Sequence, residues 1–299
     1  MVSDLLNSKR ISVFGFDTWQ PAIAQADQLD AINKLEQGKV LFFPDLRFIC
    51  SGDEQALLNP ALVNPKTKNI SFNFNNGELR GTLADMNQQT ALKALLQRYA
   101  EHSVSLIQHL LPHYRGHLEM GRTSLRVVEV AERQAPSYRK DDTRLHIDAF
   151  PATPNQGRRL LRVFCNIHPD NKPRVWRLGE PFTEVARRFM PLINKPLPGN
   201  AWLLQKLKIT KGRRTHYDHY MLNIHDKMKA DLHYQQSVDQ EEVHFPNRTW
   251  IVFTDQASHA ALAGQHMLEQ TFYLPVSGLL NPEQSPLRIL EKITGQLLT

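Results

Sequence analysis

Past Gly121 the sequence is dominated by short apolar and aromatic segments that are separated by Pro, Gly and Asn. Segments of this kind predict strands, here at residues 124–130, 145–150, 158–167, 201–209, 249–254 and 266–274. Helical patterns occur at 181–192 and 220–232, but long helices do not alternate with the strands as a doubly wound sheet requires. The pattern therefore predicts a mainly β fold with flanking helices and a double-stranded β-helix core of the jelly-roll, cupin-like kind.

The residues before Gly121 predict a smaller α/β region. Strands are expected at 10–16 and 40–43 with a helix at 21–35 between them, and a leucine repeat predicts a long helix at 88–111. Near the other terminus, Ser285 and Pro286 suit the start of a helix with Leu290, Ile293 and Leu297 as its apolar stripe. We expect one domain, 1–299, consisting of an N-terminal α/β flanking region (1–120), a jelly-roll core (121–276) and a C-terminal helix (277–299).

The composition is that of a globular protein, with 41% hydrophobic and 22% charged residues. The two cysteines, Cys50 and Cys165, give no disulfide scaffold. Residues 1–16 lack the apolar core of a signal peptide, and no stretch approaches 18 apolar residues. We therefore expect a soluble cytoplasmic protein.

The net charge is +6, and basic residues cluster at 158–159, 174–177, 187–188 and 206–214. This charge favours an anionic partner, which can be nucleic acid, a phosphorylated or carboxylated glycan, or an acidic membrane surface. A solvated basic surface with no specific partner is the alternative interpretation.

A His-x-Asp pair, His146 and Asp148, precedes the predicted strand at 158–167. Residues two apart in a strand point to the same side, so both can bind one ion. A distant histidine, His259, completes a 2-His-1-carboxylate triad, which is diagnostic of non-haem Fe(II) oxygenases. His266 competes for the third position. A second pair, His216 and Asp218, lies in a polar, helical segment and is not expected to bind metal.

An iron centre of this type needs a co-substrate that supplies two electrons, and 2-oxoglutarate is the common one. Its far carboxylate requires a cation, for which the planar fork of arginine is suited. In the strand at 158–167, Arg162 is flanked by apolar residues and is our predicted anchor, with an outward-facing arginine as the alternative. Asn166, on the same face, is predicted to bind the co-substrate or a neighbouring group.

Three blocks, LHIDAFP, RRLLRVFCNIHPDNKPRVWRLGEPF and TWIVFTDQASHAALAGQHMLEQTFYLP, together resemble the Kdo hydroxylases, which act on 3-deoxy-D-manno-oct-2-ulosonic acid (Kdo). The similarity covers about 124–275. It implies a catalytic domain that uses Fe(II), 2-oxoglutarate and O2, with ascorbate as a stimulant, and His146, Asp148 and His259 at the iron-binding positions. Many members of the wider superfamily carry a basic residue about ten positions after the distal histidine, whereas this chain has Leu268, Glu269 and Gln270.

The resemblance also implies the substrate. It would be Kdo-lipid A, hydroxylated at C3 of Kdo to form Ko during synthesis of the lipopolysaccharide inner core. The enzyme would act peripherally at the cytoplasmic face of the bacterial inner membrane. Within the basic clusters, the predicted substrate contacts are Arg174, Arg177, Arg213 and Arg214.

Two other functions fit the residues. One is a 2-oxoglutarate oxygenase that acts on protein or nucleic acid, although the chain shows no recognition module and we expect no nucleic-acid partner. The other is a metal-free, glycan-binding jelly roll. The oligomeric state and the Kdo residue that is attacked stay open.

Overall fold

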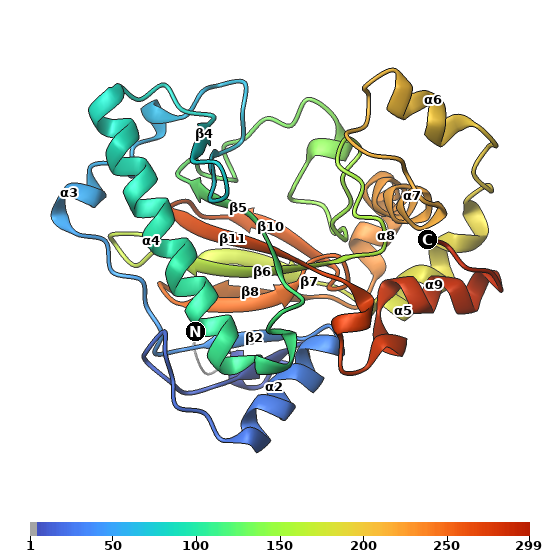
Figure 1. Cartoon of the computed structure of the whole chain (residues 1–299), viewed down its shortest axis with the longest axis horizontal. Helices are drawn as coiled ribbons and strands as arrows, with labels where there is room; N and C mark the ends of the chain where they lie inside the picture. The colour runs from blue at the N-terminus through green and yellow to red at the C-terminus, as the bar shows by residue number, and fades with distance from the viewer. Residues whose placement is uncertain (1–4) are drawn as a thin grey trace.

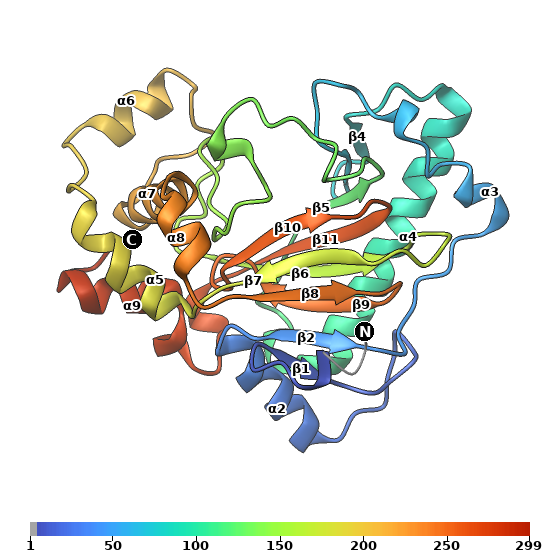
Figure 2. The same cartoon turned by 180° about the vertical axis from the view of Figure 1, so that it is seen from behind.

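The computed structural model describes residues 5–299, and Figures 1 and 2 show it from opposite sides. The strands of this part form an eight-stranded sheet and a three-stranded sheet. The large sheet contains, in spatial order, β1 (Ile11–Val13), β2 (Val40–Phe43), β9 (Thr249–Phe253), β6 (Arg159–Asn166), β11 (Met267–Leu274), β5 (Glu119–Arg126), β3 (Ile70–Asn73) and β4 (Glu78–Arg80). The small sheet is β10 (His259–Ala263), β7 (Arg174–Leu178) and β8 (Glu241–Phe245).

The two sheets pack against each other through aromatic side chains. Trp176 of the small sheet meets Phe164 and Trp250 of the large sheet edge to face, with ring centroids 5.1 and 5.6 Å away. Apart from the parallel pair β1 and β2, the paired strands of both sheets are antiparallel. Two facing sheets with this core confirm the predicted mainly β, cupin-like fold with flanking helices.

Helices flank the sheets (Figure 1). They are α2 (Gln25–Glu36), α3 (Gly52–Gln55), α4 (Met86–Leu110), α5 (Phe182–Phe189), α6 (Asn200–Lys206), α7 (His216–Ala230), α8 (Leu232–Ser237) and α9 (Pro286–Thr294). Of these, α4 lies across one face, and α5 to α9 are gathered at one end. The long helix α4 begins with a capping box between Asp85 and Gln88 and crosses the outer face of the large sheet. Its Tyr99 donates a 3.0 Å hydrogen bond to the Val163 carbonyl of β6, so α4 packs directly over this part of β6.

The prediction of strands at 145–150 and 201–209 was wrong. Residues 145–150 form only an isolated bridge between His146 and His259, because Asp148 already leaves the ladder and bonds the Thr254 carbonyl through its backbone N–H. Residues 200–206 form the helix α6. The alternation of Lys206, Leu207 and Lys208 favours a strand only where a neighbouring strand is available, and within residues 5–299 this segment pairs with none.

The sequence analysis missed β3, β4, β7, β8 and β10. In β7, Arg174 occupies a buried position that the alternation rule reserves for apolar residues. The C-terminal stripe was partly wrong, because Ile293 and Leu297 are exposed whereas Leu290, Leu287 and Leu298 are buried. The division of the domain at 120 and 276 stays a prediction, and its first four residues lie outside the described part.

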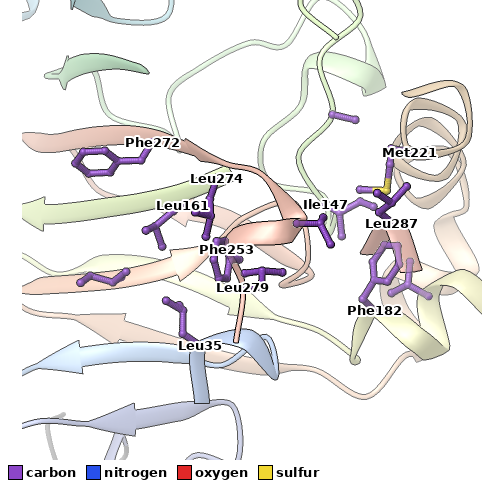
Figure 3. Close-up of a cluster of buried hydrophobic side chains, with 14 of the residues drawn as sticks. Leu35, Ile147, Leu161, Phe182, Met221, Phe253, Phe272, Leu274, Leu279 and Leu287 are labelled. Carbon is purple, nitrogen blue, oxygen red and sulfur yellow. The ribbon is translucent and has the colours of Figure 1, made fainter. Parts of the chain in front are cut away.

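The main hydrophobic core runs from the large sheet into the helices (Figure 3). Ile147, which is fully buried, lies on the helix side of this cluster near Met221 of α7 and Leu287 of α9. Since Ile147 separates His146 from Asp148, burying it turns the two flanking side chains away from the core.

Candidate metal centre

Backbone hydrogen bonds hold the three predicted metal ligands together. His146 and His259 exchange N–H to carbonyl bonds of 2.9 and 2.8 Å, and the Asp148 N–H donates to the Thr254 carbonyl at 2.8 Å. The loop with the His-x-Asp pair is thus fixed to the segment that connects β9 with β10. The same-side orientation expected for a strand is obtained here without one.

The side chains of His146, Asp148 and His259 converge, and their ligand atoms all lie within 4.8 Å of one another. His146 Nε2 is 3.8 Å from Asp148 Oδ1, and the two imidazole centroids are 4.7 Å apart. His266, the competing histidine, instead packs on His168 at 4.8 Å. The structure therefore brings His259, and not His266, to His146 and Asp148, as the sequence predicted.

Each imidazole directs one particular nitrogen toward the cluster. The Nδ1 atom of His146 lies 2.8 Å from the Arg144 carbonyl, and that of His259 lies 2.8 Å from the Ala257 carbonyl. A carbonyl oxygen only accepts, so both Nδ1 atoms carry the proton and donate. This tautomer leaves the Nε2 lone pairs free for a metal ion.

The charge state also suits a metal. Burial lowers the pKa of His146 well below its ordinary value, and the nearby Lys229 ammonium lowers it further. Burial likewise lowers the pKa of His259. Burial alone would raise the pKa of Asp148, but the Arg162 guanidinium keeps it far below its usual range. Two neutral imidazoles and one carboxylate are the donor set of a non-haem Fe(II) site.

Arg162 lies at the triad. Its Nη1 atom is 3.0 Å from Asp148 Oδ2 and 3.5 Å from Glu269 Oε1. Glu269 is also bonded by Arg126, at 2.9 and 2.7 Å. Arg162 is therefore buried with its charge compensated, and the alternative of an outward-facing arginine is excluded.

The other predicted cofactor contact, Asn166, is on the same strand face as Arg162 but four residues further on, roughly 13 Å along the strand. Its amide donates to the carbonyls of Lys172 and Phe245, and its Oδ1 accepts from the His168 N–H. These bonds fix the turn that follows β6, so the structure does not bring Asn166 to the triad.

The predicted substrate arginines lie in three different places. Arg174 is buried between the sheets, and Arg177 is half-buried at the outer face of β7. Arg213 and Arg214 are near α6, where Arg214 donates to the Pro151 carbonyl. The four residues therefore do not form one surface.

Sequence reasoning missed several groups around the triad. The Trp176 ring stacks on His259 at 5.1 Å, and His225 meets the His146 ring at 5.4 Å. His225 and the buried Lys229 belong to α7, the segment that the sequence analysis described as polar and helical. The helix is present, but it is not polar all round, because α7 buries one whole side. The second His-x-Asp pair is structural, since Asp218 closes the capping box of α7 with Thr215.

A cleft of about 670 Å³ adjoins this region. Its lining includes Lys66, Lys68, Arg133, Lys140, Asp141 and Asp142. The Asp142 carbonyl accepts a 2.8 Å bond from the Ala261 N–H, two residues after His259. Burial would raise the pKa of Asp142, but Lys68 holds it at about 2, so the carboxylate stays charged. With four basic and two acidic lining residues, the cleft is basic overall, and it lies next to β10, the strand that begins with His259.

The comparisons with known proteins agree with this geometry. Residues 18–297 match the family model described as 3-deoxy-D-manno-oct-2-ulosonic acid (Kdo) hydroxylase. The chain is 46% identical to a crystal structure of the Kdo hydroxylase KdoO, a non-heme Fe(II) alphaketoglutarate dependent dioxygenase, in complex with alphaketoglutarate and Fe(III). That match covers 97% of this chain and 98% of the other, with a TM-score of 0.94.

Two further KdoO structures are similarly close. The complex with cobalt(II) gives 46% identity and a TM-score of 0.95, and the complex with succinate and Fe(III) gives 45% and 0.93. Each match covers 97% of both chains. Among curated proteins, no match was found.

Proposed function

Because the chain belongs to the Kdo hydroxylase family and is a non-heme Fe(II)- and 2-oxoglutarate-dependent dioxygenase, we propose that it hydroxylates C3 of Kdo on Kdo-lipid A to form Ko. The observation that carries this proposal is the buried triad, with its two free Nε2 atoms and one carboxylate, beside a basic cleft. A Kdo-bearing glycolipid presents carboxylates and phosphates, and a basic cleft suits such a substrate.

We assign His146, Asp148 and His259 as the residues that hold Fe(II). Bound iron, with 2-oxoglutarate and O2, supplies the oxidation that turns a C–H bond into C–OH while 2-oxoglutarate becomes succinate and carbon dioxide. The protein's part is to orient these groups. The Arg144 and Ala257 carbonyls fix the two imidazoles, Trp176 packs against His259, and Arg162 fixes Asp148.

Arg162 is our proposed anchor for 2-oxoglutarate, since its Nη1 lies 3.0 Å from the triad residue Asp148 and its Nε atom has no hydrogen-bond partner in the described residues. Arg174 is the alternative. It is on the same face of β7 as Trp176, two residues or roughly 7 Å deeper between the sheets. Its buried Nε also lacks a partner in residues 5–299, and this position suits a small anion better than a large glycan.

We place the reaction at the cytoplasmic face of the inner membrane, where the glycolipid is available to a peripheral enzyme. No helix within residues 5–299 is long and apolar enough to cross a bilayer. Arg213 and Arg214, which line a second hollow beside α6, are proposed to contact phosphates of the substrate. That ascorbate stimulates turnover stays a prediction.

The test is to incubate the purified enzyme with Fe(II), 2-oxoglutarate, ascorbate and Kdo-lipid A, and to measure the product by mass spectrometry. We expect a gain of one oxygen atom, located on C3 of Kdo. His259→Ala should abolish the gain, whereas the control His266→Ala, which removes a buried histidine outside the triad, should retain it.

Three results would contradict the proposal. Unchanged Kdo-lipid A together with 2-oxoglutarate turnover on a peptide or oligonucleotide would favour the rival substrates. Glycan binding that is unaffected by loss of His146 and Asp148, without turnover, would favour the metal-free binding protein. Oxygen at another carbon would contradict the position.

A further inference from the structure

The segment from α5 to α7 exposes large apolar side chains that the core does not use. The exposed residues on and around α6 are Leu192, Leu197, Trp202, Leu203, Leu207 and Ile209. Trp202 is 57% exposed and Leu197 is 74% exposed. These six side chains fall within residues 192–209, and Leu197 and Trp202 line the same hollow, so apolar groups are concentrated here in the way that marks an interaction site. We name these six residues the α6 surface.

The charges around the α6 surface are of one sign. Residues 185–217 contain no Asp or Glu, and the basic residues Arg187, Arg188, Lys195, Lys206, Lys208, Lys211, Arg213 and Arg214 all fall within this range. Lys206 lies over the Trp202 ring, with its Nζ 4.7 Å from the ring centroid. Lysines beside exposed Trp and Leu form the pattern of segments that lie in the interface of a bilayer with anionic headgroups.

The chain that follows the α6 surface is hydrogen-bonded to the segment that follows Asp148. The Lys211 N–H donates to the Ala152 carbonyl at 2.9 Å, and Gln156 Nε2 donates to the Arg213 carbonyl at 3.0 Å. Residues 151–157 directly follow the loop with Asp148. A membrane that contacts α6 would therefore lie near the chain segment that leads out of the site.

Other exposed groups lie at the same edge of the molecule. In Figures 1 and 2, α6 and the loops between β5 and β6 project from one edge, where α4 also begins. Leu83 and Met86, at the start of α4, are 59% and 82% exposed. The basic cleft belongs to these same β5 to β6 loops, through Arg133, Lys140 and Asp142.

We propose that the α6 surface docks on an anionic phospholipid bilayer, so that the cleft faces the membrane that carries the glycolipid. This inference rests on the proposed function for its biological purpose, but the contact itself is physical and can be tested separately. The apolar side chains would enter the membrane interface, and the lysines would pair with lipid phosphates. The attraction between lysines and phosphates should weaken as the salt concentration rises.

The experiment measures sedimentation of the full-length, iron-loaded enzyme with vesicles of phosphatidylcholine alone or mixed with phosphatidylglycerol. We expect binding to the anionic vesicles, with weakening at high salt. Trp202→Ser with Leu203→Ser should lower the vesicle partition coefficient by roughly tenfold or more, because two inserted apolar side chains are lost. Lys206→Glu with Lys208→Glu should lower it in anionic vesicles only.

The matched control is Ile49→Ser with Leu232→Ser, two residues of 69% and 59% exposure outside the α6 surface. It should bind vesicles like the unmodified enzyme. Unaltered thermal melting of every variant shows that each one is folded. Equal binding to both vesicle types would overturn the proposal. So would a loss of vesicle binding in the control variant as large as that of Trp202→Ser with Leu203→Ser.

A second readout separates this inference from the proposed function. Turnover of Kdo-lipid A in detergent micelles should be the same for Trp202→Ser with Leu203→Ser as for the unmodified enzyme, whereas turnover of Kdo-lipid A in vesicles should fall. Absence of turnover in both preparations, with vesicle binding intact, would contradict the proposed substrate and leave the docking surface standing.

Discussion

Replacing Arg162 by Met tests the electrostatic organisation of the centre. The substitution keeps much of the side-chain volume but removes the guanidinium that lies 3.0 Å from Asp148 and 3.5 Å from Glu269. Glu269 is buried, and the Asp148 side chain is 13% exposed. Breaking one partner out of a buried ion pair costs about 3–5 kcal/mol. The metal-free variant should therefore melt roughly five to eight degrees lower than the unmodified protein at pH 7.

This difference should depend on pH. The Arg162 guanidinium lowers the pKa of Asp148 in the folded protein, so the stability that it provides is present above the unfolded pKa of Asp and is lost as the pH falls toward the folded one. The gap in melting temperature between the two proteins should be full at pH 7 and should narrow below about pH 4.

The same variant tests the role in co-substrate binding. Losing a charge-assisted pair with a carboxylate costs about 1.5–3 kcal/mol, so the 2-oxoglutarate concentration for half-maximal turnover should rise roughly 10- to 150-fold. Fe(II) should still bind, because Asp148 Oδ1 and the two Nε2 atoms are unchanged. Isothermal titration with Fe(II), and then with 2-oxoglutarate, measures the two steps separately.

Arg159→Met is the control for this experiment. Arg159 is on the same strand, is fully buried and pairs with Asp255 at 2.7 Å, but the pair does not reach the triad. Both variants should lose stability, and only Arg162→Met should change the 2-oxoglutarate requirement. If the two variants show the same requirement, the reasoning that makes Arg162 the anchor is refuted, and Arg174 becomes the residue to replace.

Three further predictions concern the surroundings of the site. Replacing Trp176 by Leu removes the ring that stacks on His259, so Fe(II) affinity in a titration should fall about 10- to 100-fold, and Trp176→Phe should recover most of it. Burial, together with the neighbouring His168, lowers the pKa of His266 to about 4, so protonation of this imidazole opposes folding as the pH falls from 6.5 toward 4. The melting temperature of His266→Asn should therefore depend less on pH in that window than that of the unmodified protein. An unchanged pH dependence would contradict the assignment. Gly264 has φ +104, and a Cβ there would meet the Pro173 carbonyl at 2.9 Å, so Gly264→Ala should lower the free energy of unfolding in urea by about 1–3 kcal/mol.

The three metal ligands could be predicted from the sequence because their arrangement depends mainly on local backbone conformation. Residues two apart need only a locally extended backbone to share a side, and the wrongly predicted strand at 145–150 still orients His146 and Asp148 correctly. The choice of His259 over His266 succeeded because a buried strand, β9, leads directly toward it. Features that are encoded in one short segment could therefore be read from that segment.

The arginines show why the rest could not be predicted. Arg162 and Arg174 look alike in the sequence, because each has apolar neighbours within a short strand. Their surroundings are set by partners far along the chain: Asp148 and Glu269 surround Arg162, whereas Gly264 contacts Arg174. Burying a cation depends on such partners, and they become neighbours only when the two sheets close on each other. Position within one strand predicted that Arg162 faces inward. Whether an inward arginine holds a metal ligand, a co-substrate or a loop is decided by the residues of the neighbouring and facing segments.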